Sequence, residues 1–301
     1  MTLHVPQLFT GSKVVLAFDG LDTFAKVWLN DNKILESDNM FVPQRTDITG
    51  LVEPDEEYTL EVEFEPALTK GELIRAEHPE HKWLDFVGET SRPAVRKSQY
   101  HWGWDWGPII TCAGVWRPVH LEIYHARVST VRAEVVLAPD FGRAQVRVTA
   151  TCETNLKESL SMEMSLFLGD EMITNKSNLS VVDGHFSPTL EIQNPLLWMP
   201  AGYGSQTLYN LEVKLCIGDQ ELDRAKKRIG VRKTELVQRP DAYGKSFYFR
   251  VNDVDIFCGG ACWIPADSML TNIDSRRYRQ WIELLLAANQ VMIRQVKAAL
   301  V

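Results

Sequence analysis

The sequence lacks any long apolar stretch. Hydrophobic residues make up 45% of the 301 residues, but polar residues interrupt every apolar run well before the ~20 residues that a membrane-spanning helix needs. The chain also lacks an excess of basic residues, because its formal net charge is −8. This balance offers no attraction for nucleic acid or for an anionic membrane surface, so we expect neither as a partner.

Cysteine is scarce, and its spacing indicates no pairing. The five cysteines, at positions 112, 152, 216, 258 and 262, are scattered and odd in number, which does not suggest a disulfide framework. Cys258 and Cys262 flank Gly-Gly-Ala, but no histidine or second cysteine pair completes a set of metal ligands. We therefore interpret the cysteines as small buried side chains, and no metal site is expected.

The signatures of many catalytic classes are absent as well. The sequence has no triad motif, no glycine loop that would hold phosphates and no paired metal ligands, so no cofactor is expected. Glu89, Asp105, Glu122 and Asp267 are candidate catalytic acids by residue type alone. Nothing in their spacing pairs any two of them around a common bond.

Alternation of apolar and polar residues dominates the first part of the chain. Val14–Phe18 predicts a strand, and Ala25–Asn30 and Tyr58–Phe64 show the period of two that is typical of half-buried strands. Val115–Tyr124 is a further alternating segment. Polar turns separate these segments, so we expect an antiparallel sandwich in residues 1–125.

Residues 126–232 repeat this pattern at similar spacing. Apolar residues alternate along Val146–Ala150, Met162–Leu168 and Leu211–Ile217, and Gly-Asp turns follow the last two segments. Short strands at this spacing predict an immunoglobulin-like sandwich, and we expect its methionines in the core. No residue in this segment indicates chemistry.

The pattern changes after Arg232, where two short apolar strands precede a convincing helix. Ser275–Asn289 has apolar residues at helical spacing, and Asp274 or Ser275 can cap its start. A short apolar strand, Val291–Ile293, follows. Strand, helix, strand is the start of a (β/α)8 barrel, but residues 233–301 are far fewer than the about 250 of a complete barrel. The fold class is therefore mainly β, with an incomplete barrel at the end.

Lys70–Lys97 is charged, is interrupted by proline and glycine, and lacks strand periodicity. Thr69–His78 predicts one short helix, which Pro79 would end. Long loops in compact domains are usually functional or disordered. Because this segment leads directly into a tryptophan-rich run, we expect it to border the same site.

That run is His101–Pro108, which places three tryptophans within five residues. One interpretation is a rigid aromatic wall beside a pocket, because pyranose C–H faces stack on indole while a carboxylate such as Asp105 accepts from neighbouring hydroxyls. The alternative is a tight bend in a sandwich whose indoles are simply core. Residue types alone favour core packing.

Several longer segments resemble one enzyme family. Asp19–Asn30 (DGLDTFAKVWLN) resembles the N-terminal sugar-binding domain of family 2 glycoside hydrolases. The similarity runs in the family's order from about Lys13 to Arg294. The segments that resemble the beta-mannosidase branch, including its B-type fungal members, are His78–Trp83, Tyr100–Pro108, Ala113–Val119, Leu197–Gly204 and Gly259–Ser268.

The resemblance implies a three-part chain. We expect a galactose-binding-like, jelly-roll-like sandwich in 1–125 that is incomplete at its N-terminus, the immunoglobulin-like sandwich in 126–232, and the truncated start of a TIM barrel in 233–301. It implies a beta-mannosidase that removes terminal non-reducing β-D-mannose with retention, using two glutamates. Both glutamates would lie beyond Val301, so we expect this chain to be inactive alone. The implied substrates are β-mannoside oligosaccharides or N-glycan-derived mannosides.

The resemblance also implies the residues that contact the sugar. In this family the Trp-Asp-Trp loop reaches the mouth of the active site, so Trp104 and Asp105 are expected to contact the terminal mannose. Trp106 is a further substrate-binding candidate, with support of the loop as its expected task. Trp263 and Asp267 could line the pocket floor. Equally favoured is that Trp263 packs the barrel end and Asp267 caps a turn.

Two other functions stay open, namely a carbohydrate-binding fragment without hydrolysis and a non-functional fragment with an exposed apolar half-barrel. Met1–Thr10 has neither the basic start nor the apolar core of a signal peptide, so we expect an intracellular protein, with a secreted or vacuolar location as the alternative. The sequence does not indicate the oligomeric state.

Overall fold

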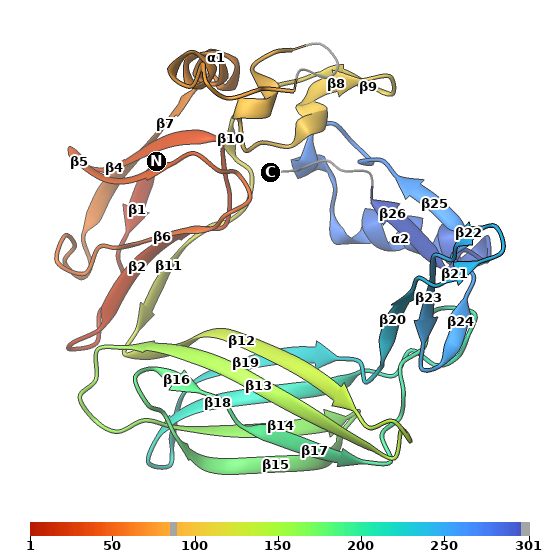
Figure 1. Ribbon diagram of the computed structural model, residues 1–301. Helices are drawn as coiled ribbons and strands as arrows, with labels where there is room; N and C mark the ends of the chain where they lie inside the picture. Colours follow the sequence, from red (N-terminus) through yellow and green to blue (C-terminus); the bar gives the residue numbers. More distant parts are fainter. Residues whose placement is uncertain (85–88, 296–301) are drawn as a thin grey trace. The chain divides into compact units, whose positions relative to one another are not determined.

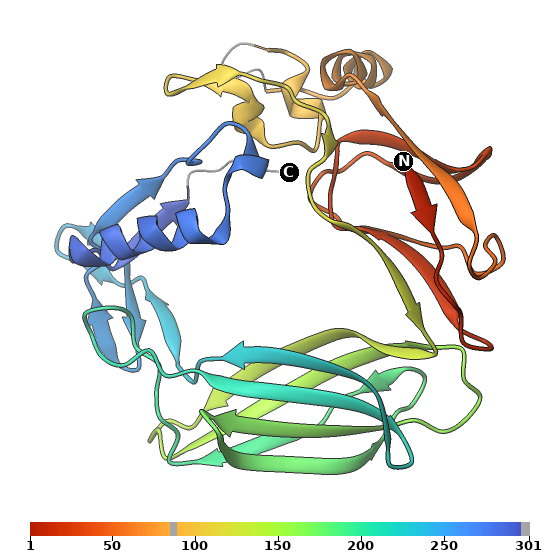
Figure 2. The same ribbon diagram turned by 180° about the vertical axis from the view of Figure 1, so that it is seen from behind.

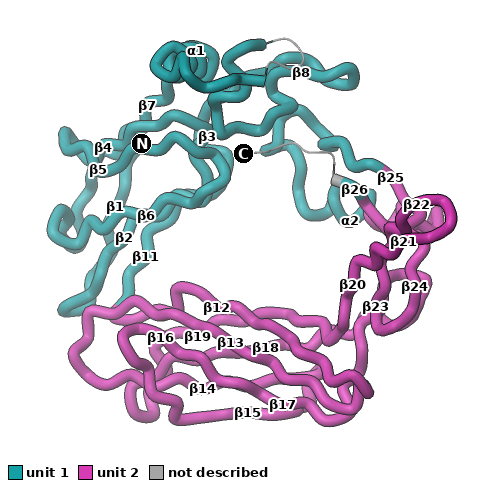
Figure 3. Tube along the Cα trace, in the orientation of Figure 1, with its two compact units in different colours: residues 1–124, 262–281, 294–301 teal, residues 125–261, 282–293 magenta. Residues whose placement is uncertain are grey.

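The computed structural model describes residues 1–84 and 89–295. The chain divides into two compact units, which Figure 3 colours separately: residues 1–124, 262–281 and 294–301 form one, and residues 125–261 and 282–293 form the other. The expected third part, 233–301, is thus divided between the units, and the boundaries at 125 and 232 stay predictions. Among the described residues, no helix is long and apolar enough to cross a membrane.

The first unit contains a sandwich of two antiparallel sheets (Figure 1). A separate two-stranded sheet pairs β10 (Gly114–Val115) with β3 (Leu21–Asp22). One sheet has the order β1 (Thr2–His4), β7 (Glu57–Glu65), β4 (Phe24–Leu29), β5 (Asn32–Ser37), and the other β11 (Val119–Tyr124), β2 (Lys13–Phe18), β6 (Gln44–Asp47).

The core of this sandwich follows the predicted alternation. Ala25, Val27 and Leu29 of β4 are buried, whereas Lys26 and Trp28 between them are only partly buried. A fully buried aliphatic side chain contributes roughly 1.5–3 kcal/mol relative to an exposed one, so this face holds the two sheets together. The other buried members of the cluster include Val5, Val14, Leu16, Phe18, Leu21, Ile48 and Leu60.

A helix and two short 3₁₀ turns follow β7. Helix α1 (Ala67–Glu77) is the one predicted from Thr69–His78, and it ends before Pro79. Its Gly71 lies so close to the loop before η1 (Arg92–Ala94) that an added Cβ would stand 2.7 Å from the Ser91 carbonyl oxygen. Of the predicted loop 70–97, residues 85–88 lie outside the described residues.

The second unit contains the immunoglobulin-like sandwich, whose sheets lie face to face in Figure 1 and, from behind, in Figure 2. Val146, Val148, Met162, Met164 and Leu166 are fully buried between the sheets, as predicted. One sheet is built from β12 (Ala126–Leu137), β13 (Arg143–Thr154), β16 (His185–Phe186) and β17 (Thr189–Gln193), and the other from β15 (Glu171–Ser180), β14 (Ser161–Leu168), β18 (Tyr209–Ile217) and β19 (Gln220–Ile229).

The alternation predicted for β18 breaks near its end. A period of two puts Cys216 on the same face as Glu212 and Lys214, yet Cys216 is 6% exposed, which agrees with its interpretation as a small buried side chain. The register between β18 and β19 shifts between Leu215 and Cys216, because Leu222 of β19 has no partner on β18. The extra residue of this β-bulge therefore belongs to β19, and β18 keeps a regular register with β14.

The last segment has short strands and one strand–helix–strand unit. As predicted, Asp274 caps α2 (Ser275–Ala287), because its Oδ1 accepts from the Arg277 N–H at 2.8 Å. Asn289 has a φ of 55° just after the helix. The strands are β20 (Thr234–Val237), β21 (Pro240–Asp241), β22 (Gly244–Lys245), β23 (Tyr248–Val251), β24 (Val254–Ile256), β25 (Gly260–Trp263) and β26 (Met292–Gln295), and η3 (Leu270–Asn272) precedes α2.

The architecture is thus mainly β, and the described residues contain one unit of the barrel type, β25–α2–β26, whose strands pair. Helix α2 has no fully buried side chain. Ile282, Leu284 and Leu286 are 45%, 68% and 46% exposed. Its apolar residues are therefore poorly covered in this chain.

The core assignment of the second sandwich leads to a first prediction. Leu211 on β18 is 0% exposed, so Leu211→Ala should lower the free energy of unfolding by about 2–5 kcal/mol through lost contacts and a cavity. Denaturant unfolding measures this. Lys176→Ala, at an exposed position on β15 of the same sheet, should change it by less than about 0.5 kcal/mol. Equal effects of the two changes would contradict the packing described.

Candidate functional site

The tryptophan-rich run forms a short β-hairpin. Strand β8 (Trp102–Trp104) pairs antiparallel with β9 (Gly107–Ile109), with Trp104 opposite Gly107 and Asp105-Trp106 as the two-residue turn. Gly103 has a φ of +83°, and an added Cβ would stand 2.8 Å from the Ile109 side chain. The hairpin therefore requires glycine at position 103, both for its backbone conformation and for its cross-strand packing.

The hairpin separates the three tryptophans. Trp102 is 1% exposed and packs with Phe24, Ala67 and Val95. The indole of Trp102 is therefore a core side chain, which is the alternative that residue types alone favour. Trp104 and Trp106 are only partly buried, and Asp105 between them is exposed. The tip thus offers an open carboxylate flanked by two indoles.

Neighbouring side chains support the indoles of the tip. The Arg92 guanidinium lies 5.8 Å from the centroid of the Trp104 ring, within the range of a cation–π contact. Arg92 Nε also donates to Gln99 Oε1 at 2.8 Å. The rings of Tyr100 and Trp106 are 6.3 Å apart at an angle of 40°. The tip therefore has packed neighbours on the side of η2 (Gln99–His101).

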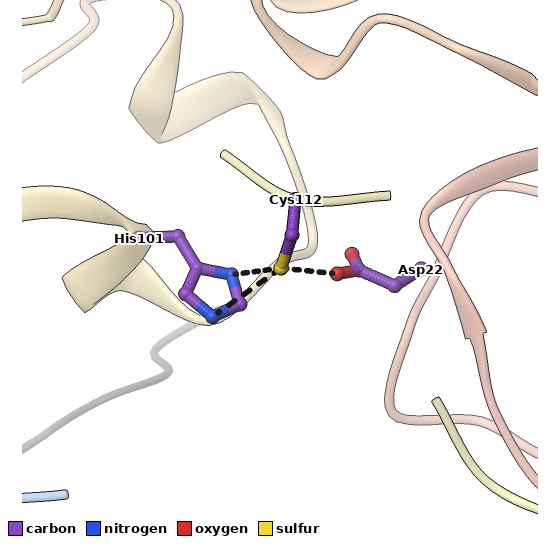
Figure 4. A group of neighbouring side chains, drawn as sticks. All are labelled: Asp22, His101 and Cys112. Atoms are coloured by element: carbon purple, nitrogen blue, oxygen red, sulfur yellow. Dashed lines mark hydrogen bonds between the residues drawn. The ribbon is translucent and has the colours of Figure 1, made fainter. Parts of the chain in front are cut away.

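A buried charged cluster lies at the base of the hairpin. Lys97 Nζ forms an ion pair with Asp22 Oδ2 and donates to the Cys112 carbonyl oxygen at 2.7 Å. The Cys112 thiol lies 3.7 Å from the same Asp22 oxygen and 3.9 Å from both ring nitrogens of His101. Figure 4 shows the sulfur between the imidazole and the carboxylate.

Asp22, His101 and Cys112 have ligand atoms within 4.8 Å of one another, close enough to hold a metal ion. The donor set of carboxylate, imidazole and thiol is chemically suitable for a transition metal. However, the Lys97 ammonium already occupies the position beside Asp22 Oδ2, and a cation there would be repelled by it. We therefore assign the charge balance of this cluster to Lys97 rather than to a metal.

Burial also sets the protonation of the cluster. It lowers the pKa of His101 from 6.5 to about 4; the charge of Lys97 acts in the same direction, while Asp22 and a backbone bond with Ser268 oppose it. Burial raises the pKa of the Cys112 thiol, against the effect of Lys97. The imidazole and the thiol are thus both neutral near pH 7, so the cluster offers no thiolate for nucleophilic chemistry.

The contacts of Trp263 and Asp267 are with nearby residues of the same segment. The Trp263 ring stacks on Tyr278 at 5.9 Å and lies 5.2 Å from Trp281. Asp267 accepts from the Met269 N–H at 2.8 Å and from Asn272 Nδ2 at 3.3 Å. This is the arrangement of the packing and turn-capping alternative, and a role in lining a pocket stays a prediction.

Sequence reasoning missed the residues of the buried cluster. Asp22, Lys97 and Cys112 come from separate parts of the chain, and none belongs to a motif that indicates a polar core. Lys97 ends a charged segment and was expected in a loop, yet its side chain is 0% exposed. Only the folded chain brings these side chains together.

Comparison with known proteins agrees with this architecture. Residues 1–117 match the model of the glycosyl hydrolase 2 galactose-binding domain-like family, and residues 126–232 match that of glycosyl hydrolases family 2. The chain belongs to glycosyl hydrolase family 2. Its resemblance to that family, including the sandwich domains, is thereby confirmed.

Among relatives, Beta-mannosidase B from Emericella nidulans is 49% identical over 96% of this chain and 34% of its own length. Beta-mannosidase B from Aspergillus niger is 45% identical over 97% of this chain and 35% of its own length. The chain thus spans about a third of the length of these curated relatives.

Solved structures show the same fold. The β-D-mannosidase from Dictyoglomus thermophilum has a TM-score of 0.89 at 30% identity, covering 100% of this chain and 37% of its own. A putative beta-galactosidase from Bacteroides fragilis has a TM-score of 0.71 at 14% identity, covering 98% of this chain and 41% of its own. At that identity the likeness is one of fold alone.

The hairpin geometry leads to a second prediction. Gly103→Ala should destabilise the chain by about 1–3 kcal/mol, because the new methyl group meets Ile109 and the backbone must keep a positive φ. Thermal unfolding, with proteolysis of the hairpin as a second readout, measures this. Gly107→Ala is the matched control, since an added Cβ there has no atom within 4 Å. A neutral Gly103→Ala would show that the hairpin differs from the one described.

The depressed pKa of His101 leads to a third prediction. The unfolded chain takes up this proton near pH 6.5 and the folded chain only near pH 4. The contribution of His101 to the free energy of unfolding is therefore fully present above about pH 6.5. It is lost as the pH decreases from about 6.5 to about 4, by on the order of 3 kcal/mol. Urea unfolding across this range should show a flatter profile for His101→Gln, while His4→Gln, at an exposed position, should follow the wild type. A wild-type slope in His101→Gln would refute the assignment.

Proposed function

We propose that this chain supplies the scaffold and the sugar-contacting hairpin of a beta-mannosidase, which removes terminal non-reducing β-D-mannose from β-mannosides with retention. The similarity to Beta-mannosidase B across 96% of the chain supports this proposal. The structural observation behind it is the hairpin tip, where the exposed carboxylate of Asp105 lies between two partly buried indoles.

The chemistry of the tip suits a pyranose. An indole such as Trp104 covers the C–H face of the ring, while the Asp105 carboxylate accepts from two neighbouring hydroxyls. Hydrogen bonds to a charged group contribute about 1.5–3 kcal/mol each, so Asp105 dominates the polar part of the contact. Trp106 supports the turn from the side of Tyr100.

Bond cleavage needs a further pair of groups. A retaining glycosidase uses two carboxyl groups about 5–5.5 Å apart, and we propose, as an expectation from the family resemblance, that both are glutamates beyond Val301. Within this proposal the chain contacts the substrate and does not cleave it alone. The substrates are β-mannoside oligosaccharides or N-glycan-derived mannosides, and the intracellular location stays a prediction.

The fourth prediction concerns binding by this chain. Saturation-transfer NMR, which detects millimolar binding, should show transfer to methyl β-D-mannopyranoside, and Asp105→Ala should weaken binding at least about tenfold. Asp170→Ala, at an exposed turn of the second sandwich, is the matched control and should bind as the wild type.

The outcomes separate the alternatives. Binding without release of p-nitrophenol from p-nitrophenyl β-D-mannopyranoside agrees with the proposal for this chain. Hydrolysis by the chain alone would refute the assignment of the catalytic pair to residues beyond Val301. Unchanged binding in Asp105→Ala would refute the role of the hairpin tip.

A further inference from the structure

The charged cluster closes a defined segment of the chain, which we call the hairpin module: residues 98–111, containing η2, β8, the Asp105-Trp106 turn and β9. Lys97 precedes this module and Cys112 follows it. The Lys97 ammonium donates to the Cys112 carbonyl oxygen at 2.7 Å. One side chain therefore joins the start of the module to its end.

The same ammonium joins the module to the sandwich. Its anionic partner is Asp22, on strand β3. Strand β3 pairs with β10, where Gly114 lies opposite Asp22, only two residues after Cys112. The end of the module is thus held at Asp22 both by a backbone ladder and by the lysine.

Other bonds either shape the module or anchor its start. Inside it, the Ile110 N–H donates to the His101 carbonyl at 2.8 Å. Ahead of it, the Met40 N–H donates to the Arg96 carbonyl at 3.1 Å, and the Ser98 N–H lies 3.0 Å from Met40 Sδ. The start is therefore fixed by the 39–40 segment, and the Lys97 ammonium fixes the end against it.

The ion pair between Lys97 and Asp22 is unusual because it is buried. The side chains of Lys97 and Asp22 are 0% and 3% exposed. A buried ion pair is seldom more stabilising than apolar residues of the same volume, whereas removing one partner alone is costly. What distinguishes the pair from apolar side chains is that its bonds are directional. The ammonium donates to two fixed acceptors, Asp22 on β3 and the Cys112 carbonyl oxygen, whereas apolar side chains would make no such bonds.

We propose that Lys97 is a positioning residue for sugar binding, which holds the hairpin module against strand β3 so that Trp104 and Asp105 are presented in one arrangement. Lys97 lies at the base of the module and acts through it, without contacting the sugar. This inference rests on the proposed function, because it assigns the sugar contact to the tip.

The test is a charge-free double variant, Lys97→Met with Asp22→Asn, in the full chain. It leaves no unpaired buried charge, so the chain should keep a cooperative unfolding transition, but the bond to Cys112 is gone. Hydrogen exchange of the amides in 102–110 should accelerate about tenfold or more, and binding of methyl β-D-mannopyranoside should weaken about tenfold. Lys97→Arg, which keeps a cation beside Asp22, should have slower exchange in 102–110 and tighter mannoside binding than the double variant.

The matched control is Lys33→Met with Glu36→Gln, which removes a solvent-exposed ion pair of the same sandwich with a 3.1 Å separation. It should leave exchange of the hairpin and binding unchanged. Wild-type exchange in 102–110 of the double variant would overturn the inference, because the module would then keep its order without Lys97.

The two proposals fail in different ways. If the wild-type chain does not bind the mannoside while the double variant loosens the hairpin, the sugar assignment fails and Lys97 keeps its role in holding the module. If the double variant binds the mannoside as tightly as the wild type, while Asp105→Ala does not, the tip assignment stands and the positioning role is overturned.

Discussion

A lysine ammonium with no solvent contact must find its partners inside the protein, and here they come from two places that the chain separates widely. The carboxylate belongs to Asp22 in the first sandwich, and the carbonyl belongs to Cys112, after the hairpin. Removing either charge alone leaves the other buried and unpaired, at a cost of about 3–5 kcal/mol. In our proposal, the order of the hairpin module and the arrangement of the tip depend on this pair.

The sequence predicted the regular parts well, because local patterns decide them. Alternation located β4, β7, β13, β14 and β18, and the capping residue Asp274 located the start of α2. The burial of Cys216 interrupts the alternation of β18, and the β-bulge beside it lies in β19, so the residues of β18 alone do not predict it. The burial of Lys97 was not predicted for a related reason: a charged residue next to a loop is expected in solvent. Asp22, 75 residues away, and the Cys112 carbonyl oxygen together make its burial possible.

The candidate site was predictable in part. The run of tryptophans indicated either a core or a sugar contact, and the hairpin has Trp102 in the core and Trp104 partly buried at the tip. The sugar contact of Trp104 stays a proposal. Residues two apart in a strand face the same side, so Trp102 and Trp104 differ because one lies at the base of the hairpin and the other next to the turn. That placement depends on Gly103 and on pairing with Ile109. Composition alone could not distinguish the two indoles.

The separation of Trp102 from Asp105 has a consequence for divergence among related chains. Because the tip residues contribute little to the buried cluster of Phe24, Val95 and Trp102, selection can alter them one at a time without first compensating for a loss of folding. Residues at the base are under the opposite constraint, since loss of the charge of Lys97 or Asp22 alone leaves its partner buried and unpaired. Under the proposed sugar contact, related chains should therefore vary more at the turn, Asp105-Trp106, than at Lys97 and Asp22.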